Sequence, residues 1–348
     1  MIRIGIIGTG RISARHIKEI SAVADAKITA VCDVDTDKLN AVADSLGIPA
    51  DRRFTNYKDL IACDEVDAVE VCTPNHLHVP MAIDVLKAGK PVEIEKPLST
   101  SYKDGVDELL DLIDKTKLTN MMCFSYRFMP AVRYAKHLIE SGKLGKIVNI
   151  SVEYLQSGVF IPGRRLEWRF VKEFAGSGTL GDLGVHLIDM TRFLIGDFES
   201  VFGMSNIVVK ERRRLDSDEI GTVDTDDLTG FMARLSGGVI ANFLVTKCAI
   251  GESNTIKYEV FGTEGVIKFN LKSPSEITVA HAVNGTEAKY ETYDVPEEFV
   301  LGQEECFIKS LSGEVREYYP TARDGADCQR IVDAIVESAE KNAVISLI

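Results

Sequence analysis

An otherwise apolar segment, GTLGDLGVHLIDMTRF at residues 178–193, carries three polar side chains at helical spacing. Asp182, His186 and Asp189 follow one another at intervals of four and three, so at 3.6 residues per turn they share one helix face, within about 40° of one another. Histidine has a pKa near neutrality and can take a hydroxyl proton, and a carboxylate one turn away can orient it. The pattern indicates either an acid–base pair of Asp182 and His186 or a buried polar network. For Asp189 we favour a structural role.

A glycine turn near the N-terminus is a candidate phosphate-binding site. Residues 2–8 (IRIGIIG) predict a strand, residues 12–23 predict a helix, and Gly8 and Gly10 mark the turn that joins them. Gly8 permits the tight turn, and Gly10 lets the backbone approach a pyrophosphate at the helix N-terminus. Ser13 replaces the third glycine of the G-x-G-x-x-G pattern and is small enough for close packing. The strand–turn–helix context predicts a dinucleotide-binding turn.

An acidic residue, Asp33, ends the second predicted strand, 27–33 (KITAVCD). It follows the glycine turn at the distance that a dinucleotide site requires. A carboxylate there would accept hydrogen bonds from the adenosine ribose and repel a 2′-phosphate, which favours NAD over NADP. The alternative is that Asp33 caps the next helix or closes a turn, and Asp35 competes for either role.

A lysine precedes a proline at the end of another predicted strand, 91–97 (PVEIEKP). The carboxyl ends of parallel strands face the cofactor crevice, and Pro97 restricts the backbone of Lys96. Lys96 is therefore a candidate for binding a substrate oxygen. Pairing with Glu95 or contact with a phosphate is the competing interpretation, and both stay open at this point.

The order of the predicted elements indicates two domains and an α/β fold class. Short apolar strands alternate with helices over the first ~120 residues, which predicts a doubly wound parallel (Rossmann) sheet in a dinucleotide-binding domain, residues 1–122. The later strands alternate apolar and polar residues, which predicts a large open, mainly antiparallel sheet in a substrate-binding and oligomerisation domain, residues 123–348. Further helices are predicted over 36–47, 78–89, 101–115, 130–141, 180–195 and 322–340, and further strands over 66–74, 120–125, 146–155, 228–236, 238–247, 256–270 and 276–283.

Composition narrows the classes of function. The 348-residue chain has a net charge of −13, which disfavours nucleic acid and anionic membranes as partners. No apolar run approaches the ~20 residues of a membrane span, and the N-terminus lacks the layout of a signal peptide. The seven cysteines form no CxxC pair. Together these features predict a cytoplasmic protein with mainly buried thiols. His76 and His78 lack a third ligand at suitable spacing, so we expect no metal site.

Motifs in a fixed order along the chain indicate one enzyme family. The chain resembles the glucose–fructose oxidoreductase/inositol dehydrogenase (Gfo/Idh/MocA) family in GTGRISARH, AVCD, VCTPNHLHVPMAIDVLKAGKPVEIEKPLS, SYRFMPAV, WRF with AGSGTLGDLGVHLIDMTRFLIG, and FGTEGVI. The resemblance spans essentially the whole chain. It implies an N-terminal Rossmann domain, a C-terminal domain with an open antiparallel sheet, a nicotinamide cofactor, and oxidation or reduction of a cyclic polyol or sugar.

The resemblance also implies roles for individual residues. We expect His186 to remove the hydroxyl proton, Lys96 to stabilise the developing alkoxide, and Asp182 to orient His186 or bind a neighbouring hydroxyl. The expected cofactor contacts are Gly8, Gly10, Arg11, Ile12, Asp33, Thr73, Pro74, Asn75, His78, Glu95, Lys96, Arg127, Trp168 and Arg169. Apart from the resemblance, the aromatic and arginine residues of the loop 154–170 indicate a pocket loop, and the expected substrate contacts are Lys96, Tyr154, Arg164, Trp168, Asp182 and His186.

The favoured function is NAD-dependent transfer of a hydride between a secondary hydroxyl of a cyclic polyol or sugar and the nicotinamide. A hydrolase or lyase that oxidises its substrate transiently with bound NAD is a second interpretation. A non-catalytic, dinucleotide-sensing regulator is a third, although such a protein would have little need of Lys96, Asp182 and His186 together. The open sheet predicts a homodimer or homotetramer.

Overall fold

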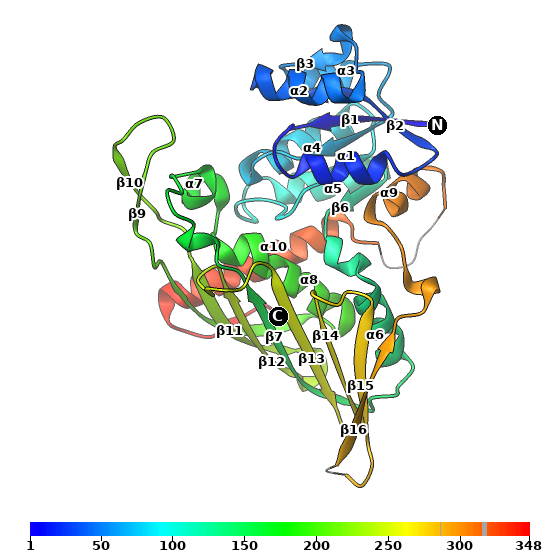
Figure 1. Cartoon of the computed structure of the whole chain (residues 1–348), viewed down its shortest axis with the longest axis vertical. Helices are drawn as coiled ribbons and strands as arrows, with labels where there is room; N and C mark the ends of the chain where they lie inside the picture. Colours follow the sequence, from blue (N-terminus) through cyan, green and yellow to red (C-terminus); the bar gives the residue numbers. More distant parts are fainter. Residues whose placement is uncertain (286, 315–318) are drawn as a thin grey trace. The chain divides into compact units, whose positions relative to one another are not determined.

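The computed structural model describes residues 1–285, 287–314 and 319–348, and the chain forms two compact units (Figure 1). The first unit comprises Met1–Phe124 and Gly302–Ala326, and the second comprises Ser125–Leu301 and Asp327–Ile348. The first division lies close to the domain boundary expected after residue 122. The segment Gly302–Ala326, which the sequence analysis places in the second domain, packs in the first unit instead.

The first unit is built on a parallel sheet with the strand order β3-β2-β1-β4-β5-β6. The order reverses between β1 and β4, which is the topological switch point of a doubly wound fold and the place where such folds bind ligands. The expected Rossmann sheet is therefore confirmed. Its strands are β1 (Ile2–Ile7), β2 (Ala26–Cys32), β3 (Arg53–Phe54), β4 (Ala68–Val71), β5 (Val92–Ile94) and β6 (Asn120–Met122).

Helices of the first unit follow the strands in chain order. Asp35 sets the start of the second of them, because its carboxylate accepts a hydrogen bond from the backbone N–H of Lys38 at 3.2 Å. Periodicity in the sequence does not reveal α3, which is short, or α9, which buries the polar Gln303 and Glu304. The helices are α1 (Ser13–Ile20), α2 (Thr36–Leu46), α3 (Tyr57–Ala62), α4 (His78–Lys87), α5 (Val106–Thr116) and α9 (Gln303–Leu311).

The second unit contains the expected large sheet, in the order β16-β15-β14-β13-β7-β12-β11-β8-β17. Its pairings are antiparallel except for β7 with β12. A separate ribbon consists of β9 (Glu211–Arg213) and β10 (Ile220–Thr222). The strands of the large sheet are β7 (Ile147–Leu155), β8 (Phe198–Asn206), β11 (Leu228–Leu235), β12 (Ile240–Thr246), β13 (Thr255–Gly262), β14 (Gly265–Asn270), β15 (Glu276–Ala282), β16 (Ala288–Asp294) and β17 (Ile345–Ser346).

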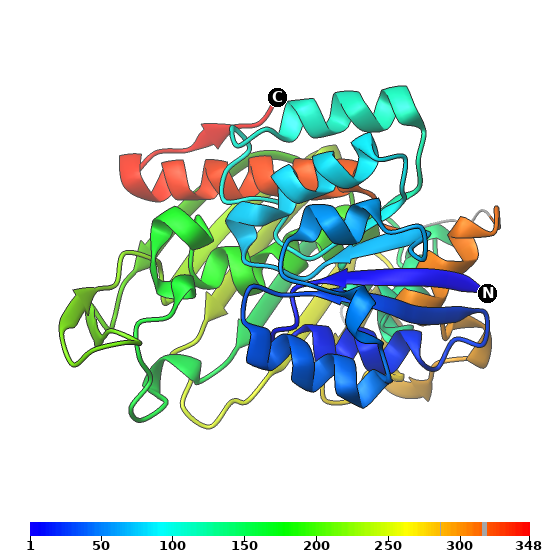
Figure 2. The ribbon, with the colours of Figure 1, turned by 90° about the horizontal axis from the view of Figure 1, so that it is seen from above.

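Helices cover one face of this sheet. The Thr191 hydroxyl of α8 (Val185–Leu194) lies 2.8 Å from the hydroxyl of Tyr258 on β13. The Ser338 hydroxyl of α10 (Ala322–Lys341) accepts a hydrogen bond from the backbone N–H of Gly203 on β8. After α10 the chain reverses into β17, which pairs with β8 (red in Figure 2). The remaining helices are α6 (Pro130–Glu140) and α7 (Lys172–Ala175).

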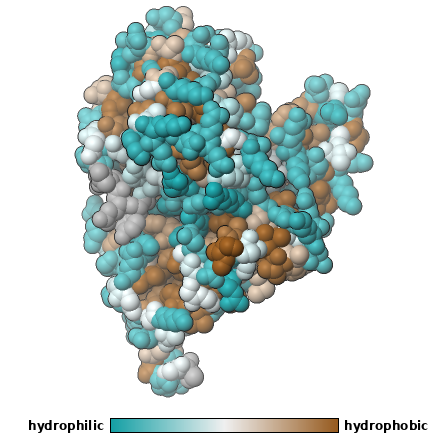
Figure 3. Space-filling view, turned by 180° about the vertical axis from the view of Figure 1, so that it is seen from behind, coloured by the Kyte–Doolittle hydropathy of each residue, from teal (hydrophilic) through white to brown (hydrophobic). Residues whose placement is uncertain are grey.

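The other face of the large sheet exposes apolar side chains. Buried and exposed positions alternate along β11 and β12, and Met204, Met232 and Leu244 point away from the helices and are exposed. Brown hydrophobic patches alternate with hydrophilic ones on the face of the second unit that Figure 3 shows. The expected homo-oligomer stays a prediction. Within the described residues, no helix is long and apolar enough to cross a membrane.

Candidate active site

The glycine turn after β1 has the geometry that a pyrophosphate site needs. Gly8 has a φ of +95°, and a Cβ there would lie 2.6 Å from the carbonyl oxygen of Cys72, so no other residue fits. A Cβ on Gly10 would meet no atom within 4 Å, which leaves space for a ligand. The Ser13 hydroxyl donates to the Gly10 carbonyl at 2.7 Å and so closes the turn where the motif has its third glycine.

The first amides of α1 complete this phosphate cradle. Ile12 takes the N-cap position, and its side chain cannot accept a hydrogen bond from the helix N-terminus. The backbone N–H groups of Ser13 and Arg15 donate to the carbonyls of Gly10 and Ile12, and no side chain caps this helix start, where the helix dipole favours an anion. The residues of the turn therefore fit the pyrophosphate of a dinucleotide.

Asp33 and Asp35, which compete in the sequence, have separate roles in the structure. Asp35 caps α2. One carboxylate oxygen of Asp33 accepts hydrogen bonds from the Thr9 backbone N–H at 2.7 Å and the Thr9 hydroxyl at 2.9 Å. Its other oxygen accepts the backbone N–H of Asp35 at 2.9 Å. Asp33 thus ties the end of β2 to the glycine turn, and the oxygen that binds the Asp35 N–H keeps a lone pair that can accept a ribose hydroxyl.

This geometry predicts the effect of Asp33→Ala on cofactor use. We expect the KM for NAD to rise about tenfold, because the ribose loses an acceptor and Thr9 loses its anchor. The preference for NAD over NADP should shrink as well, because the charge that repels a 2′-phosphate is gone. Steady-state kinetics with both cofactors measure the two effects. Asp35→Ala is the matched control: it removes a helix cap worth about 1 kcal/mol of folding stability and should leave both KM values unchanged.

His78 supports the turn that follows β4. Its ring nitrogens lie 2.7 Å from the carbonyl oxygen of Pro97 and 2.8 Å from that of Thr73, and the side chain is buried. Burial lowers the pKa of this histidine despite those two carbonyls. Both ring nitrogens face backbone oxygens, so His78 positions this turn, and a direct cofactor contact stays a prediction. Thr73, Pro74 and Asn75 remain the proposed contacts of this turn.

The side chain of Glu95 is also buried, and it binds the backbone of Lys96. One of its oxygens lies 2.9 Å from Nε2 of His16, and the other accepts the backbone N–H of Lys96 at 3.0 Å. Burial alone would raise the pKa of Glu95, but the hydrogen bond and charge of His16 outweigh it and lower the pKa to about 2. Glu95 therefore fixes the backbone of Lys96, and its expected cofactor contact stays a prediction. The Lys96–Pro97 peptide is cis.

In the second unit, the helix with Asp182 and His186 begins with an irregular turn. Leu180–Gly184 is π-helical and α8 starts at Val185. Asp226 anchors this start, because its carboxylate accepts the backbone N–H groups of Gly178 at 2.7 Å and Leu180 at 2.9 Å. A Cβ on Gly178 would lie 2.1 Å from the carbonyl oxygen of Asp226, so the tight contact requires glycine. π-turns are frequent at functional sites.

The three polar residues of this helix have different partners. Asp182 accepts a hydrogen bond from Nζ of Lys247, which follows β12, at 2.7 Å. The buried His186 ring lies 4.6 Å from the ring of Tyr126, centroid to centroid. Asp189 is more deeply buried than His186, and its partner is Arg127. Because Leu180–Gly184 is π-helical, the angle between Asp182 and His186 differs from that of a regular α-helix, and their shared face stays a prediction.

Arg127 and Asp189 form a buried ion pair. Nη2 of Arg127 donates to Asp189 at 2.6 Å and Nε donates at 2.9 Å, and both side chains are at most 6% exposed. This pair supports the structural role that we favour for Asp189, which stays a prediction. Because Asp189 engages two of its donors, Arg127 contributes to the site mainly through this pair, and a direct cofactor contact stays a proposal.

The expected substrate residues outside this helix also have defined partners. The Tyr154 hydroxyl lies 2.6 Å from that of Tyr126, and burial raises the pKa of Tyr154. The guanidinium of Arg169 stacks 4.2 Å above the Trp168 ring. Nε of Arg164 pairs with Glu167 at 3.2 Å.

Tyr126 and Lys247 contact the expected catalytic pair, and sequence reasoning did not find them. Tyr126 stands inside the quoted SYRFMPAV motif, so its position offered a signal. Lys247 offered none, because 65 residues separate it from Asp182. Each of the two places a polar group next to a residue for which we expect a catalytic role.

The contact of Lys247 with Asp182 predicts that replacing Lys247 lowers activity. We expect Lys247→Met to lower kcat/KM about 10- to 100-fold, because Asp182 loses a partner that is itself only 10% exposed. Kinetics across a range of sugar concentrations test this. Lys257→Met is the control, since Lys257 makes a similar contact with Glu153 at the surface, where ion pairs contribute little. Equal activity of the two variants would contradict a role for Lys247.

Comparisons with known proteins agree with this geometry. A family model described as "Oxidoreductase family, NAD-binding Rossmann fold" (GFO_IDH_MocA) matches residues 2–124, and a GFO/IDH/MocA C-terminal domain matches residues 132–268. The chain belongs to the GFO/IDH/MocA oxidoreductase family. Its first unit is an NAD-binding Rossmann domain, and the family includes NAD-dependent sugar and polyol dehydrogenases.

Members of the family resemble this chain over its full length. Levoglucosan dehydrogenase from Pseudarthrobacter phenanthrenivorans is 31% identical, covering 99% of this chain and 98% of the relative. Myo-inositol 2-dehydrogenase from Thermotoga maritima is 27% identical, covering 94% and 92%. A solved structure of levoglucosan dehydrogenase in complex with NADH and levoglucosan has a TM-score of 0.90, is 29% identical, and covers 99% of both chains.

Proposed function

We propose that this protein is an NAD-dependent dehydrogenase that oxidises a secondary hydroxyl of an uncharged cyclic sugar, with an anhydrosugar such as levoglucosan as the first candidate. The observation that carries this proposal is the end-to-end similarity to levoglucosan dehydrogenase, in both sequence and fold. The glycine turn, Asp33 and the Lys96, Asp182 and His186 set support the same reaction class.

The charges of the second unit favour an uncharged substrate. Two of its cationic side chains near the expected site lie against carboxylates: Lys247 on Asp182 and Arg127 on Asp189. Arg164 pairs with Glu167 in the same way. A phosphate or a uronic acid would compete with these carboxylates for the cations. A neutral hydroxyl can instead donate to Asp182 and accept from Lys247 without breaking the pair.

The proposed chemistry assigns one task to each residue. His186 takes the proton of the reacting hydroxyl, and Lys96 donates a hydrogen bond to the same oxygen as negative charge develops on it. Lys247 holds Asp182, which binds a neighbouring hydroxyl or orients His186. NAD, when bound, supplies the hydride acceptor. Glu95 and His78 keep the backbone around Lys96 and Thr73 in place.

A substrate panel tests the proposal. We expect levoglucosan or a related neutral pyranose to produce NADH at a higher kcat/KM than glucose 6-phosphate, myo-inositol or D-xylose. NADH absorbance in the presence of NAD, and separately NADP, measures this. Preference for glucose 6-phosphate would overturn the argument from charge. Reduced cofactor that stays bound without net NADH release would favour the transient-oxidation alternative, and cofactor binding without any turnover would favour the regulator.

A further inference from the structure

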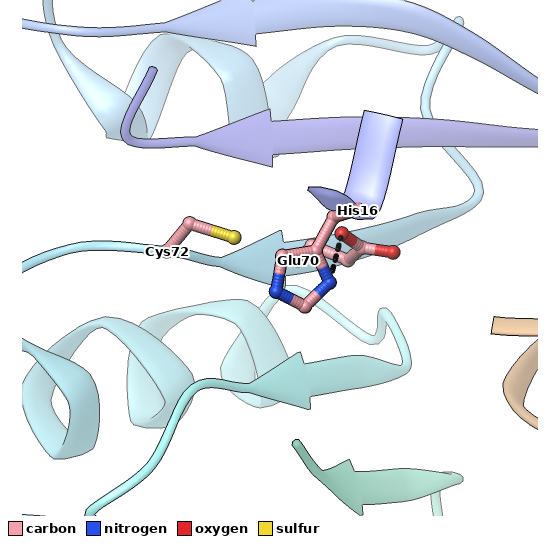
Figure 4. Close-up of side chains that lie close together, drawn as sticks. All are labelled: His16, Glu70 and Cys72. Atoms are coloured by element: carbon pink, nitrogen blue, oxygen red, sulfur yellow. Dashed lines mark ion pairs between the residues drawn. The ribbon is translucent and has the colours of Figure 1, made fainter. Parts of the chain in front are cut away.

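His16 is buried in the first unit, and the proposed mechanism gives it no task. It lies on α1, at the end of the motif GTGRISARH, and is fully buried. Its Nε2 lies 2.9 Å from Oε1 of Glu95, and its Nδ1 lies 2.8 Å from Oε1 of Glu304 on α9. Nδ1 also lies 3.5 Å from the carboxyl group of Glu70 on β4 (Figure 4). Both ring nitrogens therefore face carboxyl groups, and an imidazole donates from both nitrogens only when it is protonated.

The charge states around the ring follow from its neighbours. Burial would lower the pKa of His16, but Cys72 and the neighbouring carboxylates hold it well above its usual value. Burial raises the pKa of Glu70 and Glu93 well above the usual range, so both are neutral acids near neutral pH. Burial would raise the pKa of Glu304 as well, but hydrogen bonds from His16 and the two neutral acids lower it. The ring is therefore an imidazolium between two carboxylates.

Residues of α9 hold the other end of the ring. The Gln303 amide donates to Oε1 of Glu304 at 3.1 Å, and its oxygen accepts a hydrogen bond from Nη2 of Arg15 at 3.0 Å. These contacts orient Glu304, which in turn holds Nδ1 of His16. Because the imidazole ring is rigid, a fixed Nδ1 directs Nε2 at Glu95.

Glu95 connects His16 to Lys96. Its Oε1 takes the hydrogen bond from His16, and its Oε2 accepts the backbone N–H of Lys96 at 3.0 Å. The charges of Lys96 and Arg15 also act on Glu95. Without His16, Oε1 would be a buried carboxylate oxygen that lacks its hydrogen-bond partner, and it would attract the ammonium group of Lys96. An ammonium group drawn to Glu95 is lost as a donor to a substrate oxygen.

We propose that His16 is a positioning residue for the dehydrogenase reaction: it occupies one oxygen of Glu95 and so prevents the ammonium group of Lys96 from turning to Glu95 and away from the reacting hydroxyl. This role rests on the proposed function of Lys96 as the donor to that hydroxyl oxygen. His16 acts through Glu95 and makes no contact with the substrate in this scheme. The alternative is a purely structural role, in which the imidazolium stabilises the buried carboxylates and has no effect on Lys96.

Two replacements of His16 separate the contacts of its ring. Glutamine places an N–H donor near the position of Nε2 and can still bind Glu95, whereas asparagine places its donor near Nδ1 and can bind Glu304 but not Glu95. We expect His16→Asn to lower kcat about 10- to 100-fold, with a KM for NAD within about twofold of wild type. His16→Gln should keep kcat within about threefold of wild type. Sugar-dependent NADH formation and the melting temperature are measured for both variants.

The same replacement in a Lys96→Met background shows whether His16 acts through Lys96. We expect His16→Asn to change the residual kcat of Lys96→Met less than about twofold, because no ammonium group is left to misplace. An equal loss in both backgrounds would overturn the proposal, as would wild-type kcat in a folded His16→Asn variant. A folded His16→Gln variant that loses as much kcat as His16→Asn would do the same. Full activity of Lys96→Met alone would instead overturn the proposed function of Lys96 and with it the role of His16, so the two failures are distinguishable.

A double variant covers the case in which His16→Asn alone does not fold. Glu95→Gln removes the carboxylate that attracts Lys96 and keeps an oxygen for the Lys96 N–H, so His16→Asn combined with Glu95→Gln should recover kcat to within about fivefold of wild type. A folded double variant with the kcat of Lys96→Met would contradict the proposal. Lys18, an exposed lysine further along α1, provides the matched control. Lys18→Gln should leave kcat unchanged with and without Lys96→Met.

Discussion

Replacement of His186 by Asn is expected to lower kcat by about 10³-fold while the affinity for NAD changes less than about twofold. Asparagine keeps the approximate volume of the ring in this buried position of α8 but cannot accept a proton at neutral pH. The glycine turn, Asp33 and Thr73, which we expect to hold the cofactor, are unchanged in the variant. Sugar-dependent NADH formation gives kcat, and quenching of protein fluorescence by NADH gives the cofactor affinity.

His281→Asn is the matched control for this prediction. His281 is an exposed histidine on β15 of the same unit, and its replacement should leave kcat unchanged. A His186→Asn variant that keeps more than about a third of wild-type kcat would contradict the assignment of His186 as the base. A variant that lost kcat together with its melting temperature would instead identify a packing role, in the position against Tyr126.

Replacement of Lys96 by Met is expected to lower kcat/KM by about 10²- to 10³-fold, the cost of removing one donor to a developing oxyanion. Methionine keeps the length of the side chain without its charge. The backbone of Lys96 should stay in place, because Glu95 binds its N–H and His78 lies against the Pro97 carbonyl. The melting temperature should therefore change little.

Lys87→Met serves as the control, because Lys87 is an exposed lysine that pairs with Glu108 at the surface. It should retain wild-type kinetics. Full activity of Lys96→Met would remove Lys96 from the proposed mechanism. A rise in the KM for NAD with an unchanged kcat would show that Lys96 contacts the cofactor and not the reacting oxygen, which is the interpretation that the sequence left open.

Local sequence pattern was sufficient for the parts of the fold that local rules govern. Short apolar runs at the positions of β1, β2, β4 and β5 predict a parallel sheet, because strands that are buried on both faces carry few polar residues. Gly8 and Asp33 could be placed for the same reason: the turn and the strand end that follow β1 and β2 have fixed spacing in a dinucleotide fold.

Contacts between residues far apart in the sequence could not be predicted from local sequence pattern. The pairs Lys247–Asp182 and Arg127–Asp189 join segments with no shared periodicity, so neither partner marks the other in the sequence. Helical spacing assumes 3.6 residues per turn, so it did not predict that Leu180–Gly184 is π-helical. Glu70 and Glu93 each interrupt an apolar strand pattern once. The sequence does not show that both lie close to Glu304 on α9.

The return of Gly302–Ala326 to the first unit has a consequence for how the protein is made. When the ribosome has synthesised Met1–Phe124, the parallel sheet is covalently complete but still lacks α9, with Gln303 and Glu304. At about 5–20 residues per second the missing segment emerges roughly 10 to 40 s later, after most of the second unit. The nascent first unit must persist through that interval with Glu70 and Glu93 only partly matched. A fragment that ends near residue 124 lacks this segment and is therefore expected to be less stable than the first unit of the full chain.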